Sequence, residues 1–138
     1  MTEPKLHHVG YVVASVQESS TGFIESLGAK ADSGIIHDPL QKVFVQFLRM
    51  PAEDDVRIEL VAPAEADSPV RLFLEKGGGL HHVCYEVRDL DGALDEARLR
   101  KCVLVRSPKP AVAFAGRRIA WVITPEKLLI EYLEAQHI

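Results

Sequence analysis

The chain has 138 residues, 47% of them hydrophobic, with 16 basic and 20 acidic side chains and a formal charge of −4. This size and composition suit one compact globular domain, and the small negative charge gives no reason to expect nucleic acid or an anionic membrane as a partner. Residues 1–5 do not resemble a signal peptide, and no apolar run approaches the length of a membrane span. Because Cys84 and Cys102 are too few for a disulfide framework, we expect a reduced, cytoplasmic setting.

Hydrophobic periodicity and turn residues predict a βαβββ order in the first half of the chain. The expected elements are a strand at 5–13, a helix at 16–27 and strands at 30–36, 42–49 and 56–62. Ser15 is expected to cap the helix and Gly28 to end it. A polar turn at 51–55 precedes the last of these strands.

A linker and a second βαβββ order follow. The linker contains a short helix at about 68–76, with Ser68 as its cap and Pro69 in its first turn, and a hinge at 77–79. The second half is expected to contain a strand at 80–87, a helix at 90–100 capped by Asp89, strands at 102–106, 117–123 and 128–134, and a loop at 107–110. We therefore predict the α+β class and a single domain over 1–138, with module one at 5–63, a linker at 64–79 and module two at 80–135.

The two halves contain nearly the same peptides. Residues 6–13 (LHHVGYVV) and 80–87 (LHHVCYEV) agree at six of eight positions. A second pair, RIEL at 57–60 and LIEY at 129–132, repeats at nearly the same separation along the chain. Each half therefore offers a strand with histidine and a later strand with glutamate, which is the pattern of an internal duplication.

Alternation of side chains along a strand selects one histidine from each pair. His7 and His81 share a face with bulky apolar residues, whereas His8 and His82 share the opposite face with the small residues Gly10 and Cys84. The bulky face is expected to pack against a helix. His8 and His82 are therefore the better ligand candidates, and Cys84 is interpreted as a small buried thiol beside them.

Glu59 and Glu131 point away from the apolar face of their own strands by the same rule. Two histidines and two glutamates supply the nitrogen and oxygen donors of a divalent metal site. A single His-His pair or strand glutamate is usually incidental, and a duplicated fold without metal is the alternative. The repetition at nearly equal spacing favours a site formed by His8, Glu59, His82 and Glu131.

The repeated motifs, HVGYVV, IELVAP, HVCYEV and IEY, resemble the vicinal-oxygen-chelate (glyoxalase/bleomycin resistance/dioxygenase) superfamily over the whole chain. DSPV at 67–70, GGLHHVC at 78–84 and PKP at 108–110 are most similar to methylmalonyl-CoA epimerases. The resemblance implies two βαβββ modules whose sheets form a cupped half-barrel around one metal ion, commonly in homodimers. The superfamily's ligand positions fall on His8, Glu59, His82 and Glu131.

This resemblance implies a metal-dependent isomerase or epimerase that acts beside a carbonyl or thioester through a metal-stabilised enolate. An acyl-CoA is the favoured substrate, and Glu131 is the catalytic proton acceptor. The metal can be Co, Ni, Zn, Mn or Mg. A glyoxalase I-like lyase, suggested by Glu59 where epimerases often have Gln, and a non-catalytic small-molecule-binding protein are the alternatives.

One position departs from the epimerase pattern. Epimerases carry a glutamate ahead of the third strand as one of two proton-transfer bases, and the matching residue here is Leu40, which cannot transfer a proton. Asp38 could substitute from the turn, or Gln41 could orient a water molecule. The expected substrate contacts are Gln41, Leu129 and Arg118.

Further cations near the expected cavity could hold a carboxylate or phosphate, although each could equally be solvated surface: Lys109, Arg117 and Arg118. Arg57 is placed by alternation on the same face as Glu59, which is an unusual position for a cation; a position at the exposed end of the strand is the alternative.

Overall fold

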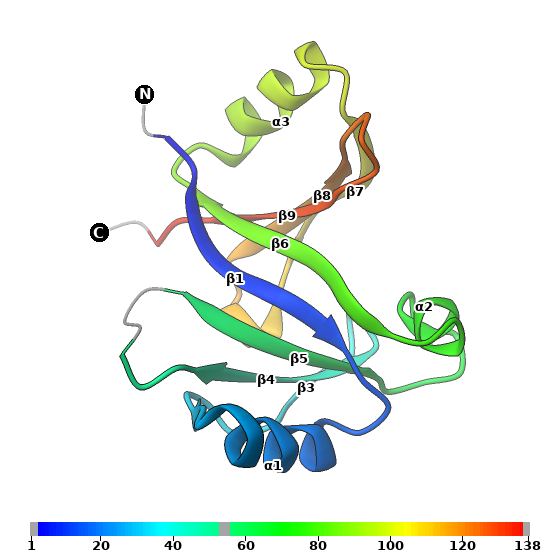
Figure 1. Ribbon diagram of the computed structural model, residues 1–138. Helices are drawn as coiled ribbons and strands as arrows, with labels where there is room; N and C mark the ends of the chain where they lie inside the picture. Colours follow the sequence, from blue (N-terminus) through cyan, green and yellow to red (C-terminus); the bar gives the residue numbers. More distant parts are fainter. Residues whose placement is uncertain (1–2, 53–55, 137–138) are drawn as a thin grey trace. The chain divides into compact units, whose positions relative to one another are not determined.

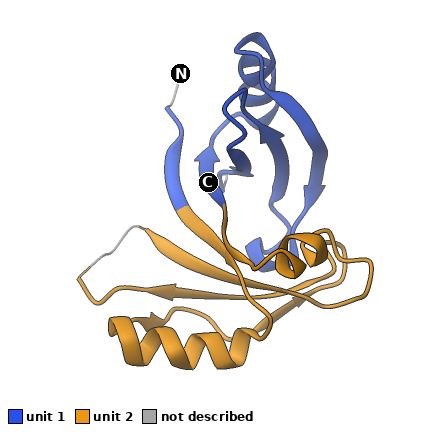
Figure 2. Cartoon of the chain, turned by 45° about the vertical axis from the view of Figure 1, so that its right-hand side comes forward, with its two compact units in different colours: residues 1–7, 82–138 blue, residues 8–81 orange. Residues whose placement is uncertain are grey.

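The computed structural model describes residues 3–52 and 56–136, which form nine strands, three α-helices and one 3-10 helix (Figure 1). Contacts divide the chain into two units, unit 1 with residues 1–7 and 82–138 and unit 2 with residues 8–81 (Figure 2). The first strand, β1 (Lys5–Val12), begins in unit 1 and continues in unit 2. None of the described helices is long and apolar enough to cross a membrane.

Unit 2 contains most of module one and the linker. After β1 come α1 (Val16–Leu27), β2 (Lys30–Ala31), β3 (Ile36–Asp38), β4 (Val43–Arg49), β5 (Arg57–Pro63) and α2 (Arg71–Glu75). The strands follow the order β2-β4-β5-β1, and β3 also pairs with β4. β1 and β5 are parallel, which requires a crossover connection.

Helix α1 covers one face of these strands because its apolar side buries against them. Val16 of α1 is buried in one cluster with Leu48 of β4 and Leu60 of β5. The helix ends are fixed locally, as the sequence predicts: the Ser15 hydroxyl accepts a hydrogen bond from the Glu18 amide, and Gly28 ends the helix at φ 72°. The side chains on the opposite face of β1 and β5 point away from α1.

The prediction of one strand at 30–36 is wrong, since β2 and β3 are separated by a bend. Ser33 lies in this bend, where its hydroxyl accepts a hydrogen bond from the Phe47 amide and its carbonyl accepts one from the Gln46 side chain. These side-chain bonds replace the strand ladder at this point, so the backbone turns between the two short strands.

The linker helix is shorter than predicted. Residues 68–70 form a turn instead of a helix, because the Ser68 carbonyl accepts a hydrogen bond from the Arg71 amide and its hydroxyl one from the Val70 amide. Val70, not Ser68, is the N-cap of α2. Residues 53–55 of the predicted turn at 51–55 lie outside the described residues.

Unit 1 contains most of module two. Its elements are β6 (Gly79–Val87), which starts at the end of unit 2, α3 (Leu90–Leu99), β7 (Val103–Pro110), η1 (Val112–Phe114), β8 (Arg118–Ile123) and β9 (Leu129–Glu134). The strand order is β6-β9-β8-β7, with β6 and β9 parallel. This is the predicted βαβββ order.

Helix α3 covers one face of the unit 1 strands in the same way. Leu90 and Leu94 are buried with Ala120 and Val122 of β8. Asp89 caps the helix as predicted, since its carboxylate accepts a hydrogen bond of 2.9 Å from the Gly92 amide.

Strand β7 is longer than predicted. It includes residues 107–110, which the sequence assigned to a loop on account of Pro108 and Pro110. β7 is the last strand in the order of unit 1 and pairs only with β8 among the strands of that order, with register shifts along its length. Proline is tolerated in such an edge strand, because its missing amide hydrogen can face solvent.

Candidate metal centre

The first candidate ligand pair lies in unit 2, on the face of β1 and β5 opposite to α1. His8 of β1 and Glu59 of β5 are buried, with 0% and 5% of their surface exposed, and Nε2 lies 3.4 Å from Oε1. The strand register places Glu59 opposite Gly10 and His8 opposite Arg57. The Glu59 carboxylate therefore reaches the His8 imidazole diagonally across the two neighbouring strands.

The second pair repeats this arrangement in unit 1. His82 of β6 and Glu131 of β9 are 4% and 3% exposed, and Nε2 again lies 3.4 Å from Oε1. Cys84, the counterpart of Gly10, stands opposite Glu131 in the register and is fully buried. The duplication seen in the sequence therefore extends to the geometry of each pair.

An aromatic ring supports each candidate histidine, and the sequence reasoning missed both rings. Phe47 of β4 lies opposite Glu59 and meets His8 edge-on at 5.5 Å between ring centroids. Trp121 of β8 lies opposite Glu131 and meets His82 edge-on at 4.7 Å. The sequence does contain a pattern that identifies these two rings. Phe47 and Trp121 are separated along the chain by the same interval as the two candidate histidines.

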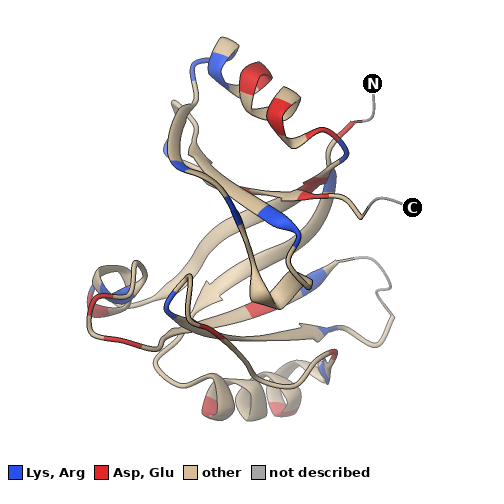
Figure 3. Ribbon diagram, turned by 180° about the vertical axis from the view of Figure 1, so that it is seen from behind, with Lys and Arg blue, Asp and Glu red and all other residues tan. Residues whose placement is uncertain are grey.

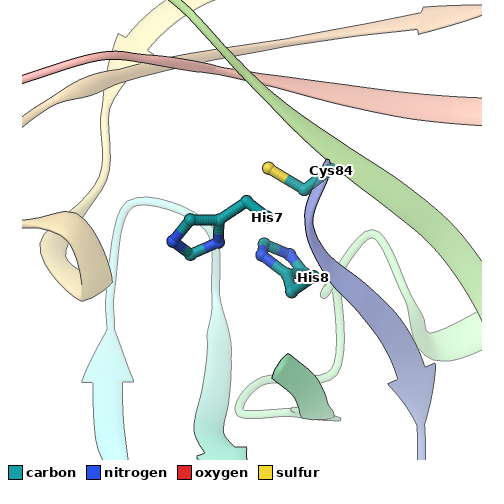
Figure 4. A group of neighbouring side chains, drawn as sticks. All are labelled: His7, His8 and Cys84. Carbon is teal, nitrogen blue, oxygen red and sulfur yellow. The ribbon is translucent and has the colours of Figure 1, made fainter. Parts of the chain in front are cut away.

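The neighbouring histidines have other surroundings. His7 meets the Phe114 ring at 5.6 Å and His81 meets the Phe73 ring at 4.8 Å, both edge-on and half-buried. Figure 4 draws His7 and His8 of β1 together with Cys84 of β6. Within each unit, the histidine beside a glutamate is thus the one that strand alternation selects.

Each His/Glu pair has the chemistry and spacing that a divalent ion requires. Two donor atoms bound to one ion at about 2.1 Å lie about 3.0 Å apart in octahedral and about 3.4 Å apart in tetrahedral geometry. The measured 3.4 Å in both pairs is within this range. Imidazole nitrogen and carboxylate oxygen suit Mn, Co, Ni, Zn and related ions, so the donor set fits the predicted cofactor.

The predicted substrate residues lie at three different places. Leu129 begins β9 on the face of Glu131 and is half-buried. Gln41 lies in the turn before β4, where its amide donates a hydrogen bond to Asp38 Oδ1.

Arg118, the third predicted substrate contact, begins β8. It shares the α3-facing side of β8 with Ala120 and Val122, and its guanidinium contacts Glu134 at 2.7 Å. The hydrogen bonds and charge of Glu134 raise the pKa of Arg118 above its usual value. Trp121, the ring beside His82, lies on the opposite face of β8, and a role of Arg118 in substrate binding stays a prediction.

Leu40 stands where epimerases are expected to carry a glutamate, and it lies at an exposed position. The Leu40 side chain is 58% exposed, whereas Asp38 is only 2% exposed. Asp38 Oδ1 accepts hydrogen bonds from the amides of Leu40 (3.0 Å) and Gln41 (3.1 Å), so this carboxylate holds the turn together.

The fold and the two His/Glu pairs are features of a known class of proteins. Residues 7–121 match the family described as the Glyoxalase/Bleomycin resistance/Dioxygenase superfamily, and the chain belongs to this superfamily. The predicted α+β fold and superfamily membership are thereby confirmed.

Within the superfamily the chain is similar to methylmalonyl-CoA epimerases, as the sequence predicted. It is 30% identical over 120 residues to the ethylmalonyl-CoA/methylmalonyl-CoA epimerase of Cereibacter sphaeroides, covering 86% of this chain and 87% of that protein. It is 32% identical over 99 residues to the mitochondrial methylmalonyl-CoA epimerase of Mus musculus, covering 70% of this chain but only 53% of the relative. The crystal structure of methylmalonyl-CoA epimerase from Mycobacterium tuberculosis superposes with a TM-score of 0.82 at 26% identity, covering 96% and 89% of the two chains.

Proposed function

We propose that this protein is a metal-dependent epimerase that acts at the α-carbon of an acyl-CoA thioester of the methylmalonyl type. The observation that carries the proposal is the buried His/Glu pair in each unit, His8 with Glu59 and His82 with Glu131, each at 3.4 Å. The similarity to epimerases over most of the chain supports it. A homodimer and a cytoplasmic location remain predictions.

The four side chains would hold one divalent ion, with two neutral imidazoles and two carboxylates balancing its charge. Phe47 and Trp121 form T-shaped contacts with the two imidazole rings, and such packing would position the donor atoms before any ligand binds. When bound, such an ion supplies a Lewis acid that stabilises negative charge developing on the thioester oxygen.

Glu131 would accept the α-proton. Its carboxylate is 3% exposed and lies on the same strand face as Leu129 and Leu133, so apolar side chains flank it on its own strand. A dry environment strengthens electrostatic interactions with the developing charge and excludes unwanted water. The proton would move from the α-carbon to a carboxylate oxygen of Glu131, and inversion would be completed when the opposite face of that carbon receives a proton, either from water or after rotation of the intermediate.

Glu59 favours a second candidate function. Epimerases often have Gln at this ligand position, so the His/Glu/His/Glu set also suits a glyoxalase I-like lyase acting on the thiol adduct of a 2-oxoaldehyde. Both reactions begin with removal of a proton beside a carbonyl group. The epimerase and the lyase therefore differ in the substrate from which the proton is removed.

The test combines metal analysis with isotope exchange. The purified protein should contain about one divalent ion per chain and should exchange the α-proton of methylmalonyl-CoA with deuterium from the solvent. His82→Ala should lose the metal and slow exchange by about 10²-fold or more, because loss of a Lewis acid removes several kcal/mol of stabilisation. His81→Ala, at the neighbouring position, is the matched control and should keep both.

Two results would contradict the proposal. Retention of metal by the His82→Ala variant together with its loss from His81→Ala would show that the wrong histidines were chosen. Turnover of a hemithioacetal without exchange into any acyl-CoA would replace the epimerase with the lyase.

A further inference from the structure

Basic residues are concentrated in one segment of a chain whose net charge is negative. Residues 97–125 contain seven Lys and Arg side chains and no Asp or Glu, whereas the rest of the chain has nine basic and 20 acidic side chains. The seven basic residues are Arg98, Arg100, Lys101, Arg106, Lys109, Arg117 and Arg118. This segment contains the end of α3 and all of β7, and Figure 3 shows acidic positions toward the start of α3 and basic positions at its end.

Three of these cations have no acidic partner. The other four form ion pairs with carboxylates: Arg98, Arg100, Arg117 and Arg118. Lys101, Arg106 and Lys109 form no ion pair with any residue of 3–52 or 56–136, and all three are exposed. Lys101 lies two residues before β7, and Arg106 and Lys109 lie within it. β7 therefore carries uncompensated positive charge along its length.

Exposed apolar side chains lie between these cations. Leu99 at the end of α3 is 80% exposed, and Val103, Leu104 and Val105 of β7 are 62%, 39% and 50% exposed. All of β7 lies in the described part of the chain, and none of its residues is buried. Apolar groups that are exposed next to one another mark sites of contact with other molecules.

The register between β7 and β8 separates the apolar side chains from the basic ones. Leu104 lies opposite Val122, on the side of the sheet that α3 covers. Arg106 lies opposite Trp121, on the other side, and the register places Lys109 on that side as well. A strand added beside β7 would therefore meet an apolar neighbour on one face and cations on the other.

The backbone of β7 is available on one side. β7 is the last strand of its order and pairs with β8 alone among the described strands. Its second half is a poor template for another strand, because Pro108 and Pro110 donate no hydrogen bond and the register shifts on both sides of Arg106. The open edge is therefore limited to a short stretch at 103–106, which suits one short segment better than a second sheet.

We propose that β7 binds a short, extended, acidic segment of another protein, which pairs with the open edge at 103–106 and carries apolar side chains at alternate positions. When a strand is added to a sheet edge, backbone hydrogen bonds supply affinity and alternate side chains supply specificity. The apolar side chains of the segment would lie beside Leu104, and its carboxylates would form charge-assisted hydrogen bonds with Arg106 and Lys109. This inference is independent of the proposed function.

Other occupants fit these observations less well. A second copy of β7 would bring the same uncompensated cations together, and like charges on neighbouring strands are destabilising. Single-stranded nucleic acid binds by stacking on aromatic side chains, and no exposed residue of the fully described range 97–125 is aromatic. A membrane surface needs a broad apolar helix face, and Leu99 is the one exposed large apolar side chain among the described residues of α3.

The experiment measures the binding of synthetic octapeptides by calorimetry. A peptide of alternating Glu and Val should bind, and one of alternating Lys and Val should not. A peptide of alternating Glu and Pro keeps the negative charge but loses half of its backbone donors, so it should bind at least about 10-fold more weakly than the Glu/Val peptide. Binding of the Glu/Val peptide should also slow amide hydrogen exchange at 103–106.

Two charge-reversal variants locate the bound peptide. Arg106→Glu and Lys109→Glu should each weaken binding of the Glu/Val peptide by about 5-fold or more, because an attraction becomes a repulsion. Either variant serves if the other does not fold. Arg88→Glu makes the same change of charge at an exposed position of unit 1 outside 97–125, and this matched control should bind the peptide as the parent does.

Several results would overturn the proposal. Equal binding of the Glu/Val and Glu/Pro peptides would show that the cations attract acidic groups without strand pairing, and no binding of either would leave the surface without this role. Binding that survives both charge reversals would place the peptide elsewhere. Binding to phosphatidylglycerol vesicles without binding to the Glu/Val peptide would assign the surface to a membrane. Self-association detected by sedimentation, with protection of 103–106 at high protein concentration, would assign it to a second copy of the chain.

Discussion

Leu40 occupies the position where epimerases carry one of two bases, and its side chain is largely exposed. The nearby carboxylate of Asp38 is occupied with the backbone amides of Leu40 and Gln41. In the proposed mechanism Glu131 is therefore the one base at the substrate carbon, and a single base would serve one face of that carbon. A proton for the opposite face must come from water or from rotation of the intermediate.

This assignment predicts that epimerisation is slower than isotope exchange. In the unaltered protein, deuterium should enter the α-carbon of methylmalonyl-CoA faster than the stereocentre inverts. Leu40→Glu should raise the inversion rate by about 10-fold or more while changing the exchange rate less, since a positioned general acid contributes about 10²–10⁴-fold. Both rates can be followed together by NMR and by a stereospecific coupled assay.

Leu72→Glu, which adds the same charge at an exposed leucine of α2, is the control and should leave both rates unchanged. Efficient epimerisation by the unaltered protein, with the Asp38→Asn variant unimpaired, would refute the one-base account. The second base would then be a residue other than Asp38 and Glu131.

The alternation of side chains along a strand accounts for the position of each histidine in β1. His8 was separated from His7 because successive side chains on β1 point to opposite faces, and the structure places His8 beside Glu59. The same rule, counted back from Trp121, places Arg118 on the far face and Arg117 on the near one.

At the scale of elements, local signals predicted helix ends well. Ser15, Gly28 and Asp89 act through hydrogen bonds or backbone angles within a few residues, so their effect is present in the sequence. The extent of β7 and the bend between β2 and β3 depend on partners far along the chain. Pro108 is compatible with a strand only because β7 is an edge, and Ser33 breaks a strand only because Phe47 supplies an amide.

The glycine segment before β6 provides a prediction at this scale. Gly78 has φ +66°, and a Cβ added there would lie 2.7 Å from the backbone oxygen of Val12. Gly78→Ala should therefore lower the free energy of unfolding by about 2 kcal/mol or more, from left-handed strain and steric overlap with a backbone atom that cannot easily move. Urea denaturation followed by circular dichroism measures this change.

Gly22→Ala is the matched control in the same unit. Gly22 lies inside α1, and a Cβ there would meet nothing within 4 Å. Alanine is the better helix former by about 0.5–1 kcal/mol, so this variant should be more stable than the parent. Equal stability of the two variants would show that the backbone at 77–79 adapts to a side chain.

At the scale of the whole molecule, the chain is a duplication in which each unit has its own helix-covered core and its own His/Glu pair. The pairs are buried, and burying a carboxylate beside a histidine is costly without a compensating charge or hydrogen bond. The two glutamates are slightly closer together along the chain than the two histidines, which shows that connecting segments changed length while the pair geometry stayed the same. Both copies keep the same buried pair, as is expected if the pairs bind the divalent ion proposed above.

Removal of metal should therefore destabilise the folded chain. An ion that binds only the folded state adds RT ln(1 + [L]/Kd), about 4 kcal/mol at 1,000 times Kd, which for a chain of this size corresponds to a Tm shift on the order of 10 °C. Chelation followed by removal of the chelator should lower Tm by this amount, and adding back a divalent ion should restore it. His82→Ala should melt at a lower temperature whether or not chelator is present, whereas His81→Ala should respond as the parent does. An unchanged melting curve after complete metal removal would mean that packing alone stabilises the fold and that the buried His/Glu pairs are tolerated without an ion.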